Sequence, residues 1–231
     1  MTDVASYGES TRQLMTETLS NPEVSGVMVI MRHSARHYDH ENPINEPFMG
    51  LTETGKEISH AWGIGLPSGL TVGFYSSFIG RCIETAYLID KGYVRQGGDT
   101  RHNIIEKTLS PYYVRDAQGL FKDYIMDADF FGKWFAGEIP AAIIDHPETI
   151  AADMRDVCVT RLKAGSGTDC SLDICVTHDW NLYVLRQHFL GLHYEAHGKV
   201  GYLDGVVIFQ KDGRFFIAAP GGVPREMPPN R

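Results

Sequence analysis

Short apolar runs alternate along the chain with longer stretches in which apolar residues recur at helical spacing. Apolar runs rich in β-branched residues, bounded by polar residues, are typical of buried strands. The apolar runs predict strands at 25–31, 70–77, 101–109 and 171–177, and a hairpin over 204–219 turning at Lys211–Asp212–Gly213. The helical spacing predicts helices within 51–66, 78–93, 146–165 and 178–192.

Local signals mark where two of these helices begin and end. Thr52 can cap a helix that starts near Glu53, whose carboxylate favours the positive helix end. Pro147 stands in the first turn of a later helix, and Gly165 follows its last residue. Both helices lie between predicted strands, which is the order expected of parallel βα units.

Strands that alternate with helices predict an α/β fold, a three-layer α/β/α sandwich with a mostly parallel central sheet. We expect residues 1–231 to form a single domain, with an insertion at about 110–145 that departs from the βα pattern. That insertion is rich in aromatic residues with interspersed Gly and Pro, which favours a lid region over the sheet edge. Core packing is the alternative interpretation, and we favour it for most of these aromatic side chains.

Composition narrows the function classes. The chain has 231 residues, 43% of them hydrophobic and 22% charged, as is ordinary for a globular protein with a full core. A formal net charge of −8 disfavours a general nucleic-acid binder, although a local cationic pocket is compatible with it. The polar N-terminal segment shows no signal-peptide core, and no apolar run is long enough to span a membrane. The cysteines form no CxxC pair, so we expect a reduced, cytoplasmic setting in which Cys82, Cys158 and Cys175 are core residues.

Residues able to do chemistry gather where predicted strands end. The first strand runs into Arg32–His33, the second into Ser76–Arg81, and the fourth into His178–Asp179. In parallel α/β sheets, ligands bind beyond the carboxyl ends of the strands. We therefore expect these clusters, together with Arg36, to converge on one pocket.

The residue types suit phosphoryl transfer. Three guanidiniums offer forked donors for a phosphate and stabilise the negative charge that spreads over its oxygens during transfer. A neutral histidine is a competent nucleophile towards phosphorus, and a carboxylic acid can protonate the leaving oxygen. Together these groups predict phosphoryl transfer without a metal or another cofactor.

The segments that carry these groups resemble those of a known family. RHSAR, beginning at Arg32, resembles the phosphohistidine signature of the histidine phosphatase superfamily, which includes phosphoglycerate mutases and acid phosphatases. SSFIGRCIETAYLI, from Ser76, is similar to the second-arginine segment of that family, and VTHDWNL, from Val176, is similar to its second-histidine segment. Their order and strand-end placement agree over roughly residues 25–210.

The resemblance implies a role for each site residue. His33 matches the nucleophile that becomes phosphorylated, and Asp179 matches the proton donor of the acid-phosphatase branch. The remaining matches form the phosphate pocket: Arg32, Arg36, Arg81 and His178. In the mutase-like branch the donor is a Glu after the third strand, and Glu106 can fill that role. Ser34 stands where the family has Gly, and the proline of the acid-phosphatase signature is missing.

Other interpretations of these residues stay open. Arg36 can face solvent, and Asp179 can cap the following helix instead of donating a proton. His37, Asp39 and His40 have the spacing of metal ligands, but no further ligand set accompanies them, so we expect no structural zinc. A metal-dependent HD phosphohydrolase is disfavoured because His178–Asp179 follows a strand, whereas such enzymes are helical.

The sequence thus predicts a phosphatase that hydrolyses a phosphomonoester through phospho-His33. Its partners are a small phosphorylated substrate and inorganic phosphate as product, with neither nucleic acid nor a membrane. The alternatives are a phosphomutase that uses the same phosphoenzyme and a phospho-ligand-binding protein without turnover. We expect specificity to reside in loop 37–50 and in the aromatic insertion.

Overall fold

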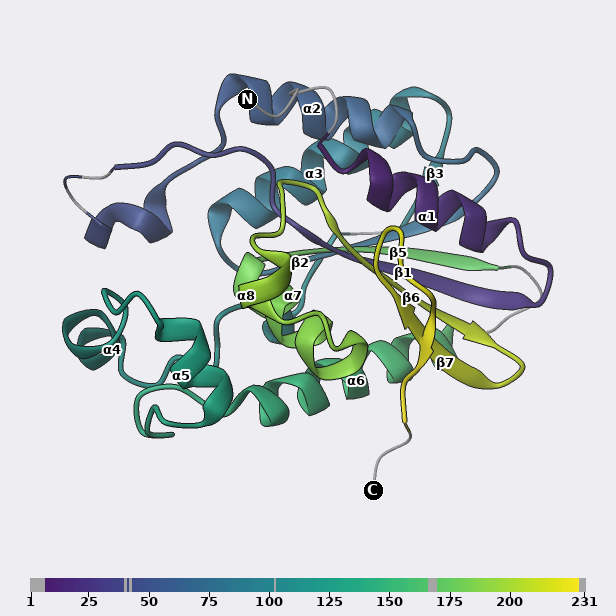
Figure 1. Cartoon of the computed structure of the whole chain (residues 1–231). Helices are drawn as coiled ribbons and strands as arrows, with labels where there is room; N and C mark the ends of the chain where they lie inside the picture. Colours follow the sequence, from purple (N-terminus) through teal and green to yellow (C-terminus); the bar gives the residue numbers. More distant parts are fainter. Residues whose placement is uncertain (1–6, 40, 42, 102, 166–169, 229–231) are drawn as a thin grey trace.

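A central sheet lies between two layers of helices in the computed structural model, which describes residues 7–39, 41, 43–101, 103–165 and 170–228 (Figure 1). The strands follow the order β3-β2-β5-β1-β6-β7-β8 across the sheet, with β4 also paired to β2. Their bounds are β1 Val24–Arg32, β2 Thr71–Ser76, β3 Asp99–Thr100, β4 Ile104–Ile105, β5 Ser171–Thr177, β6 Gly205–Lys211, β7 Arg214–Ala218 and β8 Arg225–Glu226. The predicted fold class, with a mostly parallel central sheet flanked by helices, is confirmed.

The parallel part of the sheet brings the predicted strand-end clusters to one edge. β5 lies between β1 and β2 and runs parallel to both. Arg32 and Thr177 are paired positions at the ends of β1 and β5, and Ser76 of β2 lies opposite Val176. The residues that follow these three strands therefore emerge side by side. β6, β7 and β8 continue the sheet in antiparallel fashion on the other side of β1.

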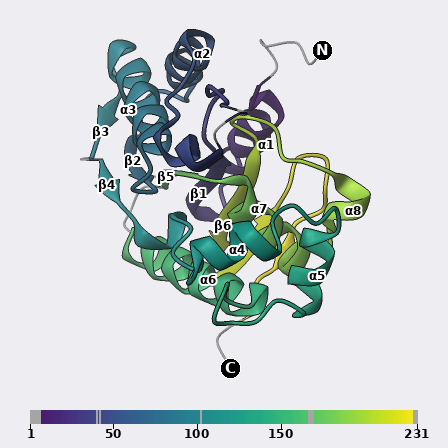
Figure 2. The same ribbon diagram turned by 90° about the vertical axis from the view of Figure 1, so that its left-hand side faces the viewer.

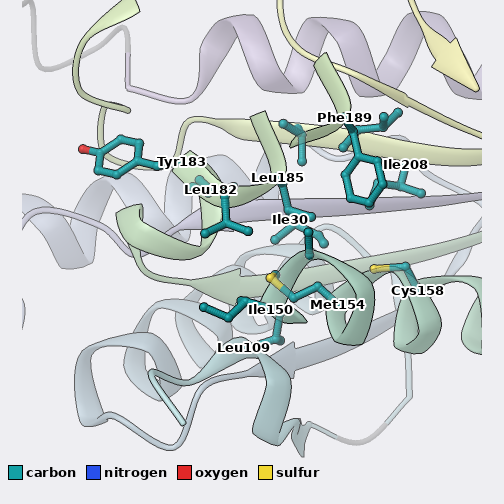
Figure 3. Close-up of a cluster of buried hydrophobic side chains, with 14 of the residues drawn as sticks. Ile30, Leu109, Ile150, Met154, Cys158, Leu182, Tyr183, Leu185, Phe189 and Ile208 are labelled. Atoms are coloured by element: carbon teal, nitrogen blue, oxygen red, sulfur yellow. The ribbon is translucent and has the colours of Figure 1, made fainter. Parts of the chain in front are cut away.

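Each face of the sheet carries its own apolar core. Helices α1 (Glu9–Leu19), α2 (Glu53–Ile64) and α3 (Gly80–Arg95) cover one face (Figure 2). On that face Met15 and Trp62 pack against strand residues. Helices α6 (Pro147–Ala164) and α7 (Asp179–Leu185) cover the other, and a π-helical turn, η4 (Arg186–Leu190), continues α7. Figure 3 shows Met154 of α6 and Leu182 of α7 among the side chains packed about Ile30 on this second face.

Most predicted elements form close to their expected bounds, and two regions differ. Of the predicted strand over 101–109, only the central pair Ile104–Ile105 forms a strand, β4. A short 3₁₀ helix, η3 (Lys107–Leu109), follows it, so the rest of the prediction is wrong. Glu106 accepts a hydrogen bond from the Thr108 backbone N–H and so starts that helix. Helix α1 was not predicted, because its surface is polar and few of its residues, such as Met15, are buried.

The hairpin and the helix caps form as expected. Asp212 and Gly213 have φ of 51° and 73°, the left-handed pair that a tight hairpin turn needs. Thr52 caps α2 by accepting from the Gly55 backbone N–H at 3.0 Å. Pro147 is the first residue of α6, and Gly165 follows its last.

The aromatic segment 110–145 packs into the core on the side of α6 and α7. It contains α4 (Ala117–Asp123) and α5 (Phe130–Ala136). Core packing is confirmed for most of its rings: Tyr113, Phe130 and Trp134 are buried and stacked, and Trp134 Nε1 donates to the Asp145 carbonyl. Trp180, beside Asp179 on α7, contacts Phe130 and Trp134. This segment therefore forms a wall against the start of α7.

Two segments extend past the carboxyl ends of β1 and β5 on opposite sides of the sheet (Figure 1). One carries α4 and α5, and the other is the loop with the 3₁₀ helix η2 (Pro43–Phe48). A further short helix, α8 (Tyr194–His197), lies between α7 and β6 in the chain. No helix among the described residues is long and apolar enough to cross a membrane.

Candidate active site

His33 and His178 lie together at the carboxyl edge of the sheet. His33 follows β1 directly, and its backbone N–H donates to the Thr177 carbonyl at the end of β5. His178 follows Thr177, and the two imidazole rings meet edge to face with centroids 5.6 Å apart. Both side chains are buried. The pairing of β1 with β5 thus sets their separation.

The hydrogen bonds of His33 define its tautomer. Nδ1 lies 2.8 Å from the carbonyl of Ser34, which can only accept, so Nδ1 carries the proton. Nε2 accepts a hydrogen bond from Nε of Arg81 at 3.0 Å and so keeps its lone pair. Burial, followed by the charge of Arg81, holds the pKa of His33 well below its ordinary value. The imidazole is therefore neutral, as a nucleophile must be.

Arg81 joins the site from the first turn of α3. Its Nε contacts His33, and its Nη2 lies 3.2 Å from Nδ1 of His178. Arg81 is 6% exposed, and burial lowers the pKa of the guanidinium, while nearby Glu46 counteracts part of that effect. A single buried guanidinium therefore touches both histidines, where it can bind an anion held between them.

His178 is held in a neutral form. Because Nδ1 faces the Arg81 donor, Nε2 carries the proton and donates to the Ser77 hydroxyl at 3.0 Å. Burial, reinforced by the charges of Arg81 and Arg32, lowers the pKa of His178 to about 3. The Cys82 Sγ atom lies 3.5 Å from Nε2 of His178, and burial raises the pKa of that thiol to about 12, so it stays protonated.

Arg32 and Asp179 form an ion pair beside the histidines. Nη2 of Arg32 lies 3.1 Å from Oδ2 of Asp179, and Nη1 donates to the Val200 carbonyl at 2.8 Å. The guanidinium stacks over the ring of Tyr202, 4.5 Å from its centroid. Asp179 is the first residue of α7, and its Oδ1 accepts from the Trp180 backbone N–H. Its carboxylate therefore both orders the helix start and faces the site.

Tyr202 reaches the site through an unusual backbone turn. The Leu203 N–H donates to the Arg32 carbonyl, and the Arg32 N–H donates to the Asp204 carbonyl, so the segment pairs with the end of β1. Leu203 has φ of 58°, a left-handed conformation that is energetically unfavourable for a residue with a branched side chain. The Tyr202 ring lies 6.0 Å from the ring of His33, and its hydroxyl donates to that of Tyr38 at 2.9 Å.

Arg36 lies in the site and does not project into solvent. Its side chain is 9% exposed, and its guanidinium stacks 3.9 Å from the centroid of the Tyr38 ring. Nη2 pairs with Oε1 of Glu46 at 2.8 Å, and the same oxygen lies 3.0 Å from Nη2 of Arg81. Glu46 was not among the predicted site residues, because nothing in its local sequence distinguishes it from any other loop carboxylate.

Two donors in the site lack a partner. Nε of Arg32 and Nε of Arg36 are buried, and neither has a hydrogen-bond acceptor among the described residues. A buried N–H without an acceptor is costly, which makes each a candidate for a ligand oxygen. An anion with several oxygens, such as a phosphoryl group, fits this set of donors.

Ser34 fits the position where the resembled family has Gly. Its hydroxyl donates to the Gly55 carbonyl at 2.8 Å, and its backbone N–H donates to Thr85. Among the described residues, Leu203 and Asp212 are the non-glycine residues with positive φ, so Ser34 adopts an ordinary conformation. The change from Gly therefore brings no backbone strain to the residue after His33.

Glu106 points to a different part of the molecule. Its Oε2 pairs with Arg161 of α6, and its Oε1 accepts from the backbone and hydroxyl of Thr108. Burial raises the pKa of Glu106, but the hydrogen bonds from Arg161 and Thr108 outweigh that effect and lower it. The predicted metal-ligand spacing of His37, Asp39 and His40 cannot be followed as a set, because His40 lies outside the described residues.

A separate cavity of about 410 Å³ adjoins residues 200–204, the segment that carries Tyr202. Its lining includes Arg186, Val200 and Asp204, and the backbone at both ends of that segment also contacts Arg32. It adjoins the His33 site through these residues, but neither His33 nor His178 lines it. The chemistry described above therefore gathers in the His33 cluster and not in this cavity.

The fold resembles solved structures of phosphate-handling enzymes. Phosphoglycerate mutase from Bacillus anthracis matches with a TM-score of 0.57 and 17% identity, covering 87% of this chain and 96% of that one. Phosphoserine phosphatase from Entamoeba histolytica, solved as a variant with phosphoserine, matches with a TM-score of 0.53 and 14% identity, over 84% of this chain and 95% of that one. A mycobacterial glucosyl-3-phosphoglycerate phosphatase in complex with VO3 has a TM-score of 0.54 and 16% identity, over 85% of this chain and 99% of that one.

At the sequence level no protein-family model matches the chain, and no curated protein matches it either. At identities this low, structural likeness establishes the fold, and activity has to be argued from the site. The chain has the α/β fold shared by phosphoglycerate mutase and the phosphatases of the histidine phosphatase superfamily, the superfamily that its three sequence segments resemble.

Proposed function

We propose that the protein is a phosphatase that hydrolyses a small phosphomonoester through a phosphohistidine at His33, without a metal or another cofactor. The observation that carries this proposal is the hydrogen bonding of His33. Nδ1 is protonated and tied to the Ser34 carbonyl, while the lone pair of Nε2 lies against Arg81. A neutral imidazole directed at a guanidinium is suited to attack a phosphorus atom whose oxygens that guanidinium binds.

In the first step, Nε2 of His33 forms a bond to phosphorus, and the bond from phosphorus to the ester oxygen breaks. Arg32, Arg36 and Arg81 bind the phosphoryl oxygens and balance the charge that spreads over them. The Ser34 carbonyl stabilises the imidazolium by holding its Nδ1 proton. The contact with Arg32 places Asp179 beside the pocket. When Arg32 turns from Asp179 to the phosphoryl oxygens, the carboxylate takes a proton from solvent, and in this acid form it protonates the leaving alkoxide.

In the second step, a water molecule attacks the phosphorus of phospho-His33, and the bond from phosphorus to Nε2 breaks. The Asp179 carboxylate takes the proton from that water and so returns to its acid form. Inorganic phosphate leaves, and His33 is again neutral. Once Arg81 turns towards the ligand, neutral His178 takes its other tautomer: the Ser77 hydroxyl then donates to Nε2, and Nδ1–H donates to a phosphoryl oxygen.

A phosphomutase is the second candidate, since a mutase from Bacillus anthracis shares the fold. It uses the same phosphoenzyme but returns the phosphoryl group to a bound product in place of water. A pocket that binds phosphate without turnover is the third. The fate of the phosphoryl group separates these candidates: free phosphate from a hydrolase, an isomeric phosphoester from a mutase, and neither from a binding protein.

The test is to trap the phosphoenzyme. Purified protein, incubated with p-nitrophenyl phosphate in the presence of a chelator and quenched, should contain one phosphoryl group that is labile in acid and stable in base. His33→Ala should abolish trapping and turnover and keep the fold. His188→Ala, which removes an exposed histidine far along the chain, is the matched control and should retain both.

Near wild-type turnover in His33→Ala would remove this residue as nucleophile. Loss of activity in the chelator, restored by a divalent ion, would contradict the metal-free mechanism. A screen of phosphorylated metabolites, read out both as released phosphate and as phosphoester isomers, then identifies the substrate and separates hydrolase from mutase.

A further inference from the structure

The carboxylate of Glu46 binds two of the arginines that the proposed reaction needs. Its Oε1 lies 2.8 Å from Nη2 of Arg36 and 3.0 Å from Nη2 of Arg81. The Glu46 backbone carbonyl also accepts from Nη1 of Arg81 at 3.1 Å. With His33 and His178 contacting the same guanidinium, both Nη groups and Nε of Arg81 already have partners. An incoming phosphoryl group must therefore displace one of these partners, and Glu46 is the acidic one among them.

The loop that carries Glu46 is closed at its base. Arg36 and Leu51 form an antiparallel bridge, and the His37 N–H donates to the Gly50 carbonyl at 3.1 Å. The two ends of the segment that carries η2 are thus joined by hydrogen bonds. Phe48, at the end of η2, is 84% exposed. The Phe48 ring therefore makes little contact with the rest of the protein, so a displacement of η2 would break few apolar contacts of this ring.

We propose that the Glu46 carboxylate competes with phosphoryl oxygens for Arg36 and Arg81 and thereby makes the site selective for dianionic phosphomonoesters over singly charged anions. This inference rests on the proposed function, because it assigns the same arginines to a phosphoryl group. Glu46 is a specificity-determining residue in this account: it competes with every ligand that enters, and only a ligand that satisfies more donors displaces it.

The count of donors favours a dianion. The Glu46 carboxylate presents one oxygen to Arg36 and Arg81, and it leaves the buried Nε of Arg32 and Nε of Arg36 without acceptors. A phosphomonoester dianion has three terminal oxygens and twice the charge, so it can satisfy these donors as well. Attraction to the buried guanidiniums grows with ligand charge.

A monoanion lacks this advantage. A phosphodiester or a simple carboxylate carries the same single charge as Glu46, but it must also give up its translational freedom to bind. Glu46 is tethered through a short loop, which gives it an effective concentration of about the millimolar range or higher. Weakly binding monoanions are therefore excluded, whereas a dianion gains enough contacts to move the loop.

The Glu46 carboxylate also offsets the repulsion between the arginines. Three guanidiniums close together repel one another, and the charge of Arg36 accordingly lowers the pKa of Arg81. Glu46 neutralises part of this repulsion and holds Arg36 and Arg81 within reach of the same position. Replacing Glu46 by Gln keeps the shape of the side chain and removes its charge. The effect of this substitution therefore reports on the competition for the arginines and not on the packing of the loop.

The test measures equilibrium binding and needs no turnover. Tungstate serves as the dianionic probe and dimethyl phosphate as the monoanionic one, each titrated calorimetrically into the full chain at pH 8. Glu46→Gln should bind tungstate at least about tenfold more tightly than the wild type, a change equal to about 1.4 kcal/mol. It should also acquire measurable affinity for dimethyl phosphate. Glu41→Gln, an exposed carboxylate of the same loop, is the matched control and should behave as the wild type.

A second measurement follows the loop itself. In Phe48→Trp, the new indole stands at an exposed position, and tungstate should change its emission as Glu46 leaves the pocket. The same titration of the wild type corrects for the native tryptophans. Unchanged indole emission at saturating tungstate would mean that η2 stays in place and that tungstate does not displace Glu46, which would contradict the proposal.

Equal or weaker tungstate binding by Glu46→Gln would overturn the proposal, because Glu46 would then organise the arginines and not compete for them. This outcome is independent of the phosphoenzyme test. If His33→Ala remains fully active while Glu46→Gln binds tungstate more tightly, the proposed mechanism fails and the role of Glu46 stands. If the phosphoenzyme forms but Glu46→Gln binds no better, the reverse holds.

Discussion

Nε of Arg81 donates a hydrogen bond to Nε2 of His33 across 3.0 Å, so the atom proposed to attack phosphorus is in contact with a group proposed to bind its oxygens. A phosphoryl group that bridges the two residues is thereby aligned for attack. This contact joins the first turn of α3 to the end of β1, two elements that are separated in the chain by η2, α2 and β2.

We expect Arg81→Ala to lower kcat/KM by at least about 10²-fold, because it removes charge-assisted donors from the reacting group. Affinity for tungstate should fall as well, measured by calorimetry. Arg81→Lys should recover only part of both losses, since an ammonium cannot reproduce the fork. Arg95→Ala, in the last turn of the same helix and exposed, is the control. Unchanged oxyanion affinity in Arg81→Ala would remove this residue from the pocket.

Buried His178 should make the fold sensitive to acid. Its pKa is about 3 in the folded protein, mainly through burial, against an ordinary value of 6.5. Below pH 6.5 the unfolded chain therefore binds a proton that the folded chain does not, and stability falls as pH falls towards 3. His33, whose pKa is also lowered, acts in the same direction.

The measurement is the free energy of unfolding in urea between pH 7 and pH 4, in buffers without phosphate. The contribution of one such histidine approaches about 1.4 kcal/mol per pH unit within this window. His178→Gln should therefore show a shallower decline with falling pH than the wild type, whatever its absolute stability. Identical slopes for the two proteins would contradict a lowered pKa for His178.

The identity of the proton donor should appear in the dependence on the leaving group. An alkoxide departs poorly without a proton, whereas p-nitrophenolate, with a pKa of about 7, needs little help. Asp179→Asn should cost about 10²–10⁴-fold with an alkyl phosphate and little with p-nitrophenyl phosphate. Glu106→Gln should show no such split, because its carboxylate pairs with Arg161 and Thr108. Equal losses on both substrates for Asp179→Asn would indicate a role confined to the start of α7.

Gly55 allows α2 to approach the residue that follows Ser34. A Cβ atom placed on Gly55 would lie 2.1 Å from the Ala35 carbonyl oxygen, and because that oxygen belongs to the backbone, no side-chain rotation relieves the clash. Gly55→Ala should therefore destabilise the fold by about 3 kcal/mol, measured by urea unfolding, because the packed elements must separate. Gly80→Ala is the control: a Cβ there meets nothing within 4 Å, so its effect should stay within about 1 kcal/mol. Equal stability of the two variants would show that α2 adjusts freely.

Some features of this protein follow from local sequence alone. Apolar runs of β-branched residues predict β1, β2 and β5, and polar residues follow each run where the strand ends. Parallel pairing then requires those ends to meet, so the meeting of His33, Arg81 and His178 was predictable before any tertiary contact was known. Thr52 and the Asp212–Gly213 turn are equally local, since their hydrogen bonds and φ values depend on immediate neighbours.

Other features depended on contacts between distant segments. In the sequence, Glu46 is an ordinary loop carboxylate. In the structure, the Arg36–Leu51 bridge brings η2, and Glu46 with it, against Arg81. Tyr202 reaches Arg32 only because long-range backbone hydrogen bonds to the end of β1 hold Leu203 in a left-handed conformation. Glu106 looks like a candidate acid in the sequence, yet Arg161 on α6 engages it away from His33.

The physical reason for this division is the range of the interactions involved. Strand pattern, helix caps and tight turns are decided by neighbouring residues, whose chemistry is visible in the sequence. The direction of a charged side chain in a loop is decided by whichever opposite charge the packed fold brings within a few ångströms. For Glu46 that charge belongs to Arg36 and Arg81, and only the tertiary structure places the three together.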